Sequence, residues 1–133
     1  MASTSYQVSV LISGIICGMI LFQSAVVAPV VFKSLDGEQA KVFLRSLFPK
    51  LFIICAVLGA LSLLQSVFWG EPSTSSYGVT LMTIIAMGVC YAIVPATNRA
   101  RDDGNQKRFA QLHRVSVYLT MSVLLVNLGW IYV

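Results

Sequence analysis

The chain of 133 residues is 57% hydrophobic and only 11% charged, with a formal net charge of +4 at pH 7. This composition excludes an ordinary soluble domain, in which apolar residues make up about half of the chain and charged residues about a quarter. We therefore expect an all-α integral membrane protein, and since a spanning helix needs about 20 apolar residues, the length allows four transmembrane helices in a single domain.

The first apolar run, residues 8–32, predicts the first span. Gly14 and Gly18 form a Gly-x-x-x-Gly pair on one helix face, which lets another backbone approach closely. We expect this face to pack inside the bundle, with a homodimer contact as the alternative. Gln23 lies deeper in the span and needs a hydrogen-bond partner, which we expect on another helix. Pro29 lacks the N–H that the Ala25 carbonyl would otherwise accept, so it should bend or end the span.

A basic stretch, residues 33–50, follows the first span. After Asp36, apolar and charged residues alternate with helical spacing, which predicts an amphipathic helix capped by Asp36 and lying along the membrane surface. Pro49 suits the first turn of a helix and opens the second span, residues 49–69. Gly59 belongs to a small-residue face of that span, which predicts close helix packing.

The second half of the chain repeats the first with an offset of 66 residues. Pro29 aligns with Pro95, and Asp36 aligns with Asp102. The third span is predicted at residues 77–97 and the fourth at 115–133, with a second charged loop between them. We therefore predict an antiparallel bundle of two pseudo-repeated helical hairpins, each with an amphipathic cytoplasmic loop.

All nine Lys and Arg residues lie between Lys33 and Arg114, four in the first loop and five in the second. By the positive-inside rule both loops face the cytoplasm of a cell or inner membrane, and both termini face the other side. The same loops could bind anionic lipid. Nucleic acid is not an expected partner, because the basic residues flank membrane spans and no aromatic stacking platform accompanies them.

Residues that carry chemistry are few. The apolar interiors of the spans contain no Asp, Glu, Lys, Arg or His, which argues against a proton-coupled pump. His113 is the sole histidine and a weak candidate for a cofactor ligand; a hydrogen bond to a loop carbonyl or to Asn98 is the plainer interpretation. Cys55 and Cys90 lie at similar depth near His113, so these three are weak candidates for a soft-metal site. We expect no enzyme and no cofactor, since no nucleophile stands beside a base in any known motif.

Short motifs occur in order at the inner ends of the spans: Phe32-Lys33-Ser34-Leu35, Leu47-Phe48-Pro49, Asn98, Phe109, Leu112-His113 and Ser116. Together they resemble the pattern of the transmembrane protein 205-like family, over about residues 14–126. The resemblance implies a small four-span protein of undefined activity, loosely associated with drug or metal resistance. It marks a set of cytoplasmic-face residues, namely Phe32, Lys33, Phe48, Pro49, Asn98, His113 and Ser116. The chain departs from the family pattern at Arg114, where glycine is usual, and at Lys50 and Leu51, where a tyrosine soon follows the proline.

Two hypotheses about function follow. The first is a non-catalytic accessory or scaffold subunit of a larger membrane complex, or a homo-oligomer, suggested by the small size and the uncharged spans. The alternative is a small transporter or binder of a metal ion, haem or lipophilic solute, built on the internal repeat. A polar cavity between the halves, lined by Gln23, Asn98 and His113, would favour the second hypothesis.

Overall fold

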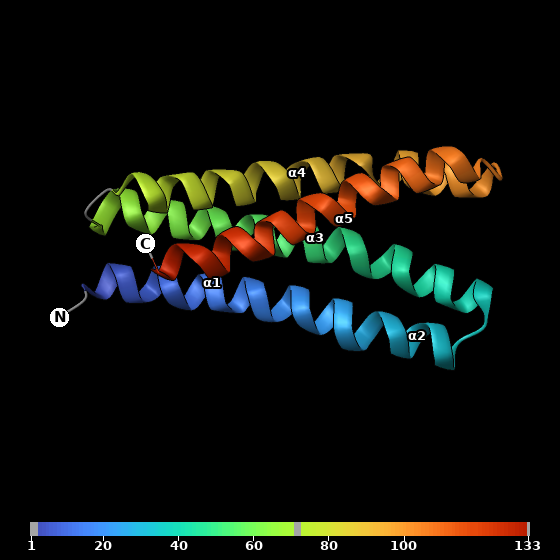
Figure 1. Ribbon diagram of the computed structural model, residues 1–133, viewed down its shortest axis with the longest axis horizontal. Helices are drawn as coiled ribbons and strands as arrows, with labels where there is room; N and C mark the ends of the chain where they lie inside the picture. Colours follow the sequence, from blue (N-terminus) through green and yellow to red (C-terminus); the bar gives the residue numbers. More distant parts are fainter. Residues whose placement is uncertain (1–2, 71–72, 133) are drawn as a thin grey trace.

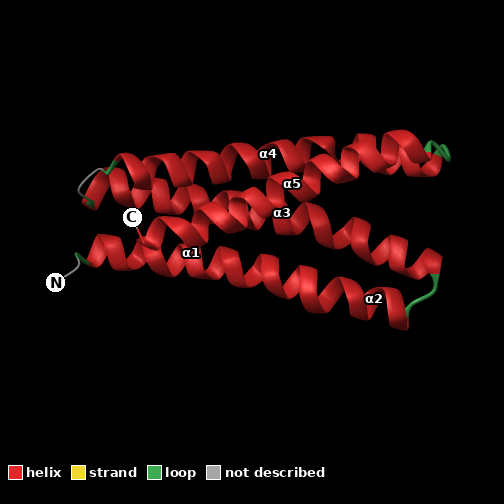
Figure 2. Cartoon of the chain, in the orientation of Figure 1, coloured by secondary structure: helices red, strands yellow, loops and turns green. Residues whose placement is uncertain are grey.

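The computed structural model describes residues 3–70 and 73–132, and within these ranges the chain forms helices and no strand (Figures 1 and 2). The first long helix comprises α1 (Thr4–Phe22), a π-helical turn η1 (Gln23–Val27) and α2 (Ala28–Ser34). The others are α3 (Gly37–Trp69), α4 (Thr74–Asp102) and α5 (Gln106–Gly129), and a 3-10 turn η2 (Trp130–Tyr132) follows α5. All four long helices are long and apolar enough to cross a membrane. The chain is therefore an integral membrane protein with an all-α fold.

The two ends of the bundle differ in charge. The α2–α3 and α4–α5 turns lie at one end, and the α3–α4 turn lies with both chain termini at the other (Figure 1). All nine Lys and Arg residues fall between residues 33 and 114, close to the first pair of turns. We call this end the basic end and the opposite end the terminal end.

Each long helix begins at a polar residue whose side chain accepts a hydrogen bond from the backbone N–H three residues later. These N-caps are Ser3, Asp36, Ser73 and Asn105. Such a cap satisfies one of the donors that a helix leaves free at its start. The predicted Asp36 cap is confirmed. In the second half the cap is Asn105, whereas Asp102, which aligns with Asp36 in the repeat, belongs to the end of α4.

The core lies in the middle of the bundle, where all four long helices meet. Its most buried side chains come from α1, α3, α4 and α5, and they include Ile16, Ile20, Cys55, Met87, Cys90 and Val123. A smaller cluster nearer the basic end joins α2 to α3 through Val31, Ala40 and Leu44. The helices therefore pack closely in the centre, while α2 has its own contact with α3.

Residues 37–48 are helical as predicted, whereas their orientation along the membrane surface stays a prediction. They form the first turns of the continuous helix α3, and Pro49 lies inside that helix instead of opening a new one. Part of the amphipathic face packs on α2, since Ala40 and Leu44 are buried against Val31, whereas Phe43 of the same face is exposed. The second charged loop is also mostly helical, because α4 continues to Asp102 and α5 begins at Gln106.

The predicted role of the glycines holds for one of three. Gly59 packs closely on α4, since a Cβ placed there would lie 3.2 Å from Ile84 and 3.3 Å from Thr83. Gly14 and Gly18, by contrast, are exposed and have no neighbouring atom within 4 Å of such a Cβ. Their expected packing inside the bundle is therefore wrong, and this face of α1 points outward.

Candidate functional site

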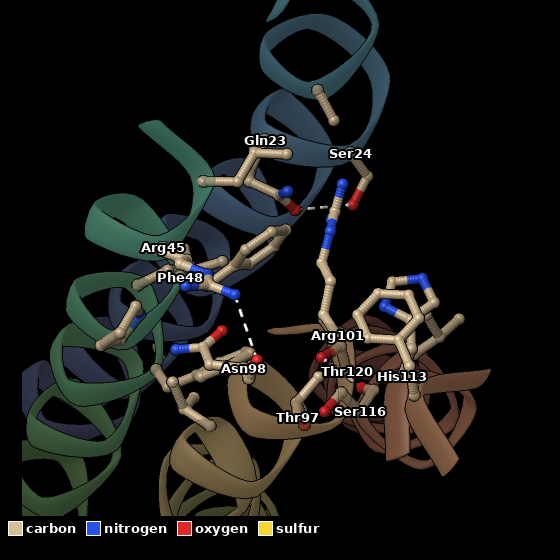
Figure 3. A pocket seen from close by; sticks show the side chains of 18 of the residues that line it. Gln23, Ser24, Arg45, Phe48, Thr97, Asn98, Arg101, His113, Ser116 and Thr120 are labelled. Carbon is tan, nitrogen blue, oxygen red and sulfur yellow. Dashed lines mark hydrogen bonds between the residues drawn. The ribbon is translucent and has the colours of Figure 1, made fainter. Parts of the chain in front are cut away.

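A pocket of about 520 Å³ lies at the basic end and is lined by residues from all four long helices (Figure 3). Both halves of the internal repeat contribute to it. Its apolar wall is formed by aliphatic and aromatic side chains, among them Leu44, Phe48, Leu51, Phe52, Val94 and Met121. Its amide and hydroxyl groups belong to Gln23, Ser24, Thr97, Asn98, Ser116 and Thr120. An apolar cavity with a few converging polar groups is the usual form of a small-molecule site.

Gln23 enters the pocket from the π-helical turn. The backbone N–H of Ala28 donates to the Gln23 carbonyl five residues earlier, which is the π-helical pattern. This shift comes just before Pro29, which has no N–H for the Ala25 carbonyl. The span therefore continues through Pro29 into α2, with a local widening.

The Gln23 side chain is only 8% exposed. Its Oε1 accepts a hydrogen bond of 3.1 Å from Ser24 Oγ, so the partner is the next residue and not another helix as expected. The Gln23 amide nitrogen has no hydrogen-bond partner among the described residues. This nitrogen is not among the buried unpaired atoms, and Gln23 lines the pocket, so the donor is available to a ligand there.

Arg45 and Asp102 tie α3 to α4 at the mouth of the pocket. Arg45 Nη2 lies 2.6 Å from Asp102 Oδ1 and donates to the Asn98 carbonyl at 3.1 Å. Lys41 Nζ lies 3.0 Å from the same Asp102 oxygen. Asp102 therefore forms ion pairs with two cations, whereas Asp36, its counterpart in the repeat, caps a helix. The buried Nε of Arg45 has no partner among the described residues.

Arg101, Phe109 and His113 form a stack along the opposite side of the mouth. The Arg101 guanidinium lies 5.5 Å from the centre of the Phe109 ring. Phe109 in turn stacks on His113 with the ring centres 5.7 Å apart and the planes nearly parallel. In the described part of the chain His113 makes no hydrogen bond, so the expected bond to Asn98 or a loop carbonyl is not formed. Its ring instead lines the pocket.

The three weak metal candidates do not come together. Cys55 and Cys90 are fully buried in the core, and the Cys90 thiol lies 3.8 Å from the Ser116 carbonyl. His113 is exposed at the mouth of the pocket, which neither cysteine lines. No group of three or more His, Cys, Asp or Glu side chains with the geometry for a metal ion occurs among the described residues. The proposed site of Cys55, Cys90 and His113 is therefore wrong.

Six of the seven residues marked by the sequence motifs line the pocket: Phe32, Phe48, Pro49, Asn98, His113 and Ser116. Lys33, the seventh, lies exposed at the end of α2 and outside the lining. Gln23, Asn98 and His113, the three residues named for a polar cavity between the halves, all line it.

Sequence reasoning missed the cations of the pocket, Lys41, Arg45 and Arg101. The sequence indicated the basic residues as signs of topology and as possible contacts for anionic lipid, and not as part of a pocket. A usable signal was present, because Asn98 and Arg101 are three residues apart and share a face once the segment is helical. Treating residues 98–114 as a loop removed that signal.

The comparisons agree with a small membrane protein whose activity is undefined. The model of a domain of unknown function, DUF4149, matches residues 11–106, which make up most of the chain and include much of the pocket. No curated protein and no solved structure matches the chain. With a match over more than half of its residues, the chain belongs to the DUF4149 family of unknown function.

Proposed function

We propose that this protein is a non-catalytic membrane protein that binds a lipophilic or amphipathic solute in the pocket at its basic end. The observation that carries the proposal is the pocket itself, which brings Gln23, Asn98 and His113 of both repeat halves to one cavity with an apolar wall. No Asp or Glu belongs to the described lining, whereas amide, hydroxyl and cationic groups do. Such donors hold and orient a ligand.

The same proposal places the basic end in the cytoplasm. All nine Lys and Arg residues lie in the segments near that end, and the positive-inside rule assigns such segments to the cytoplasmic side. A ligand would then enter from the cytoplasm or from the inner leaflet of the bilayer.

A second candidate is the accessory subunit or homo-oligomer. It is favoured by Gly14 and Gly18, which face outward from α1 and leave room for another helix to approach. A small-residue face packs well against a partner helix within lipid. The two candidates are compatible, since this face belongs to a different part of the surface from the pocket.

We also infer a distant relation to the transmembrane protein 205-like family. Its support is the ordered set of motifs near the inner ends of the spans, most of which converge on one pocket. In this proposal the pocket is the shared feature. Arg114, which replaces the usual glycine, lies beyond the described lining of the pocket.

The pocket is tested by filling it. Val94→Phe adds an aromatic ring to the wall, and Val89→Phe makes the same change on an exposed face of α4 outside the pocket. Native mass spectrometry of protein released from mild detergent then counts retained non-protein molecules. We expect the natural protein and Val89→Phe to retain one amphiphile per chain and Val94→Phe to lose it.

Equal retention by both variants would overturn the binding proposal. The same spectra test the second candidate, because stoichiometric recovery of other membrane subunits, or a stable oligomer, would support an accessory or self-assembling role. Recovery of the monomer alone would count against that role.

A further inference from the structure

The mouth of the pocket carries unbalanced positive charge. Its lining contains Lys41, Arg45 and Arg101. Asp102 is paired with Lys41 and Arg45, and in the described part of the chain Arg101 has no ion pair. One carboxylate therefore faces three cations. A neutral or cationic ligand would leave this charge unused, whereas an anionic ligand would balance it.

Arg101 is held in a direction that suits a ligand in the pocket. Its side chain extends from α4 toward Gln23 and Ser24 on the first helix (Figure 3). Phe109 supports the guanidinium through a cation–π contact of 5.5 Å. The Gln23 amide nitrogen, on a side chain that is 92% buried, has no partner among the described residues. A guanidinium and a free amide donor together suit a phosphate or carboxylate group.

Both α2 and α5 contribute side chains to the wall of the pocket. In the terminal half, α5 is joined to α1 by hydrogen bonds such as that of Ser13 to Asn127. At the basic end α2 packs on α3 instead, and α2 and α5 diverge (Figure 1). Phe32 on α2 and Val117 on α5 line the pocket and are both exposed. The wall of the pocket therefore includes exposed apolar side chains that an acyl chain of the bilayer can reach.

We propose that the occupant is an anionic phospholipid of the surrounding leaflet. Its phosphate binds Arg101 and the Gln23 amide, and one acyl chain lies against the apolar wall formed by Phe48, Phe52 and Val94, while the other chain stays in the bilayer. This inference rests on the proposed binding function and specifies its ligand. Free phosphate would leave the apolar wall uncovered, which is why a lipid fits better.

The test uses the full-length protein in nanodiscs that contain equal parts of dioleoylphosphatidic acid and dioleoylphosphatidylcholine. Native mass spectrometry measures which lipid stays bound. Arg101→Gln removes the charge in the pocket, and Arg99→Gln removes an equal charge from an exposed position on the same helix, outside the lining. Arg101→Lys restores the charge without the planar guanidinium.

We expect the natural protein to retain phosphatidic acid in preference to phosphatidylcholine. Arg101→Gln should lower that preference by about tenfold, since a charge-assisted contact is lost. Arg99→Gln should leave the preference unchanged, and Arg101→Lys should recover part of it.

Four results would overturn the inference. An equal loss in Arg99→Gln and Arg101→Gln would mean attraction of lipid to the basic surface as a whole. Equal retention of both lipids would mean that the pocket binds amphiphiles without regard to charge. That result would support the proposed binding function and contradict the assignment of an anionic lipid as the ligand. An increase in thermal stability with inorganic phosphate alone, equal to that with phosphatidic acid, would identify a free anion as the ligand. Retention of neither lipid would remove the proposed function as well.

Discussion

Asn127 joins three helices through one buried amide. Its Oδ1 accepts from Ser13 Oγ on α1 at 3.0 Å, and its Nδ2 donates to Thr83 Oγ1 on α4 at 2.9 Å. Trp130 Nε1 donates to the same Ser13 hydroxyl at 2.8 Å. Asn127 is only 2% exposed, so water cannot easily replace these partners. This network fixes α5 against α1 and α4 in the terminal half.

Removing that amide should destabilise the bundle. Asn127→Ala removes the acceptor of the Ser13 hydroxyl and a donor to the Thr83 hydroxyl. We expect a loss of about 1–2 kcal/mol, the upper part of the range for interhelical hydrogen bonds in membranes. Unfolding in increasing fractions of denaturing detergent, followed by circular dichroism, measures the change.

Ser122→Ala is the matched control. The Ser122 hydroxyl donates only to the Tyr118 carbonyl of its own helix, and the residue is partly exposed. Its loss should alter the free energy of unfolding by less than about 0.5 kcal/mol. Equal free energies of unfolding for the two variants would show that the Asn127 network does not stabilise the bundle.

At the scale of elements, α3 holds the bundle together because it contacts both neighbours. Its first turns pack on α2, and its middle packs on α4 through Gly59. The close approach at Gly59 depends on a missing side chain, since Thr83 and Ile84 occupy the space where a Cβ would lie. The outward face at Gly14 and Gly18 has no such constraint in the monomer.

Substitution by leucine distinguishes the packed Gly59 from the exposed Gly18. Gly59→Leu forces α3 away from α4 and should cost about 1–3 kcal/mol, as overpacking of a core does. Gly18→Leu places its side chain in open space, so the monomer should be at least as stable as before. The detergent-unfolding assay above measures both. Equal destabilisation by the two substitutions would contradict the outward orientation of Gly18.

At the scale of the whole molecule, the two ends have different surfaces. The basic end carries the cations and the large pocket, and the terminal end carries a smaller hollow of about 280 Å³ lined mainly by serines, among them Ser5, Ser9 and Ser66. The native thiols Cys17, Cys55 and Cys90 are all buried. An added cysteine is therefore a clean reporter of which side of the membrane an end faces.

We predict that Ser75→Cys, at the terminal end, reacts with a membrane-impermeant maleimide on intact cells. Asp103→Cys, in the α4–α5 turn, should react only after the membrane is permeabilised. The chain without an added cysteine, whose thiols are buried, is the control and should remain unlabelled. The reverse pattern would place the basic end outside and contradict the positive-inside assignment.

The sequence by itself determined the class, the number of spans and where α3 begins. Long apolar runs require helices in lipid, because every backbone group must be paired within the segment. The Asp36 cap followed from a local spacing, and it is present. The sequence also named Gln23, Asn98 and His113 as residues that would line a polar cavity between the halves, but it did not establish that such a cavity exists.

The tertiary structure alone decided which faces pack, which cations are paired and where a ligand fits. In a membrane protein both the core and the lipid-facing surface are apolar, so hydrophobic periodicity does not tell Gly59, which is packed, from Gly18, which is exposed. The pairing of Arg45 with Asp102 joins residues 57 positions apart, and it leaves Arg101 free to face Gln23. Such relations depend on the rotation and crossing of whole helices, which are set by packing across the bundle and not by any local stretch of chain.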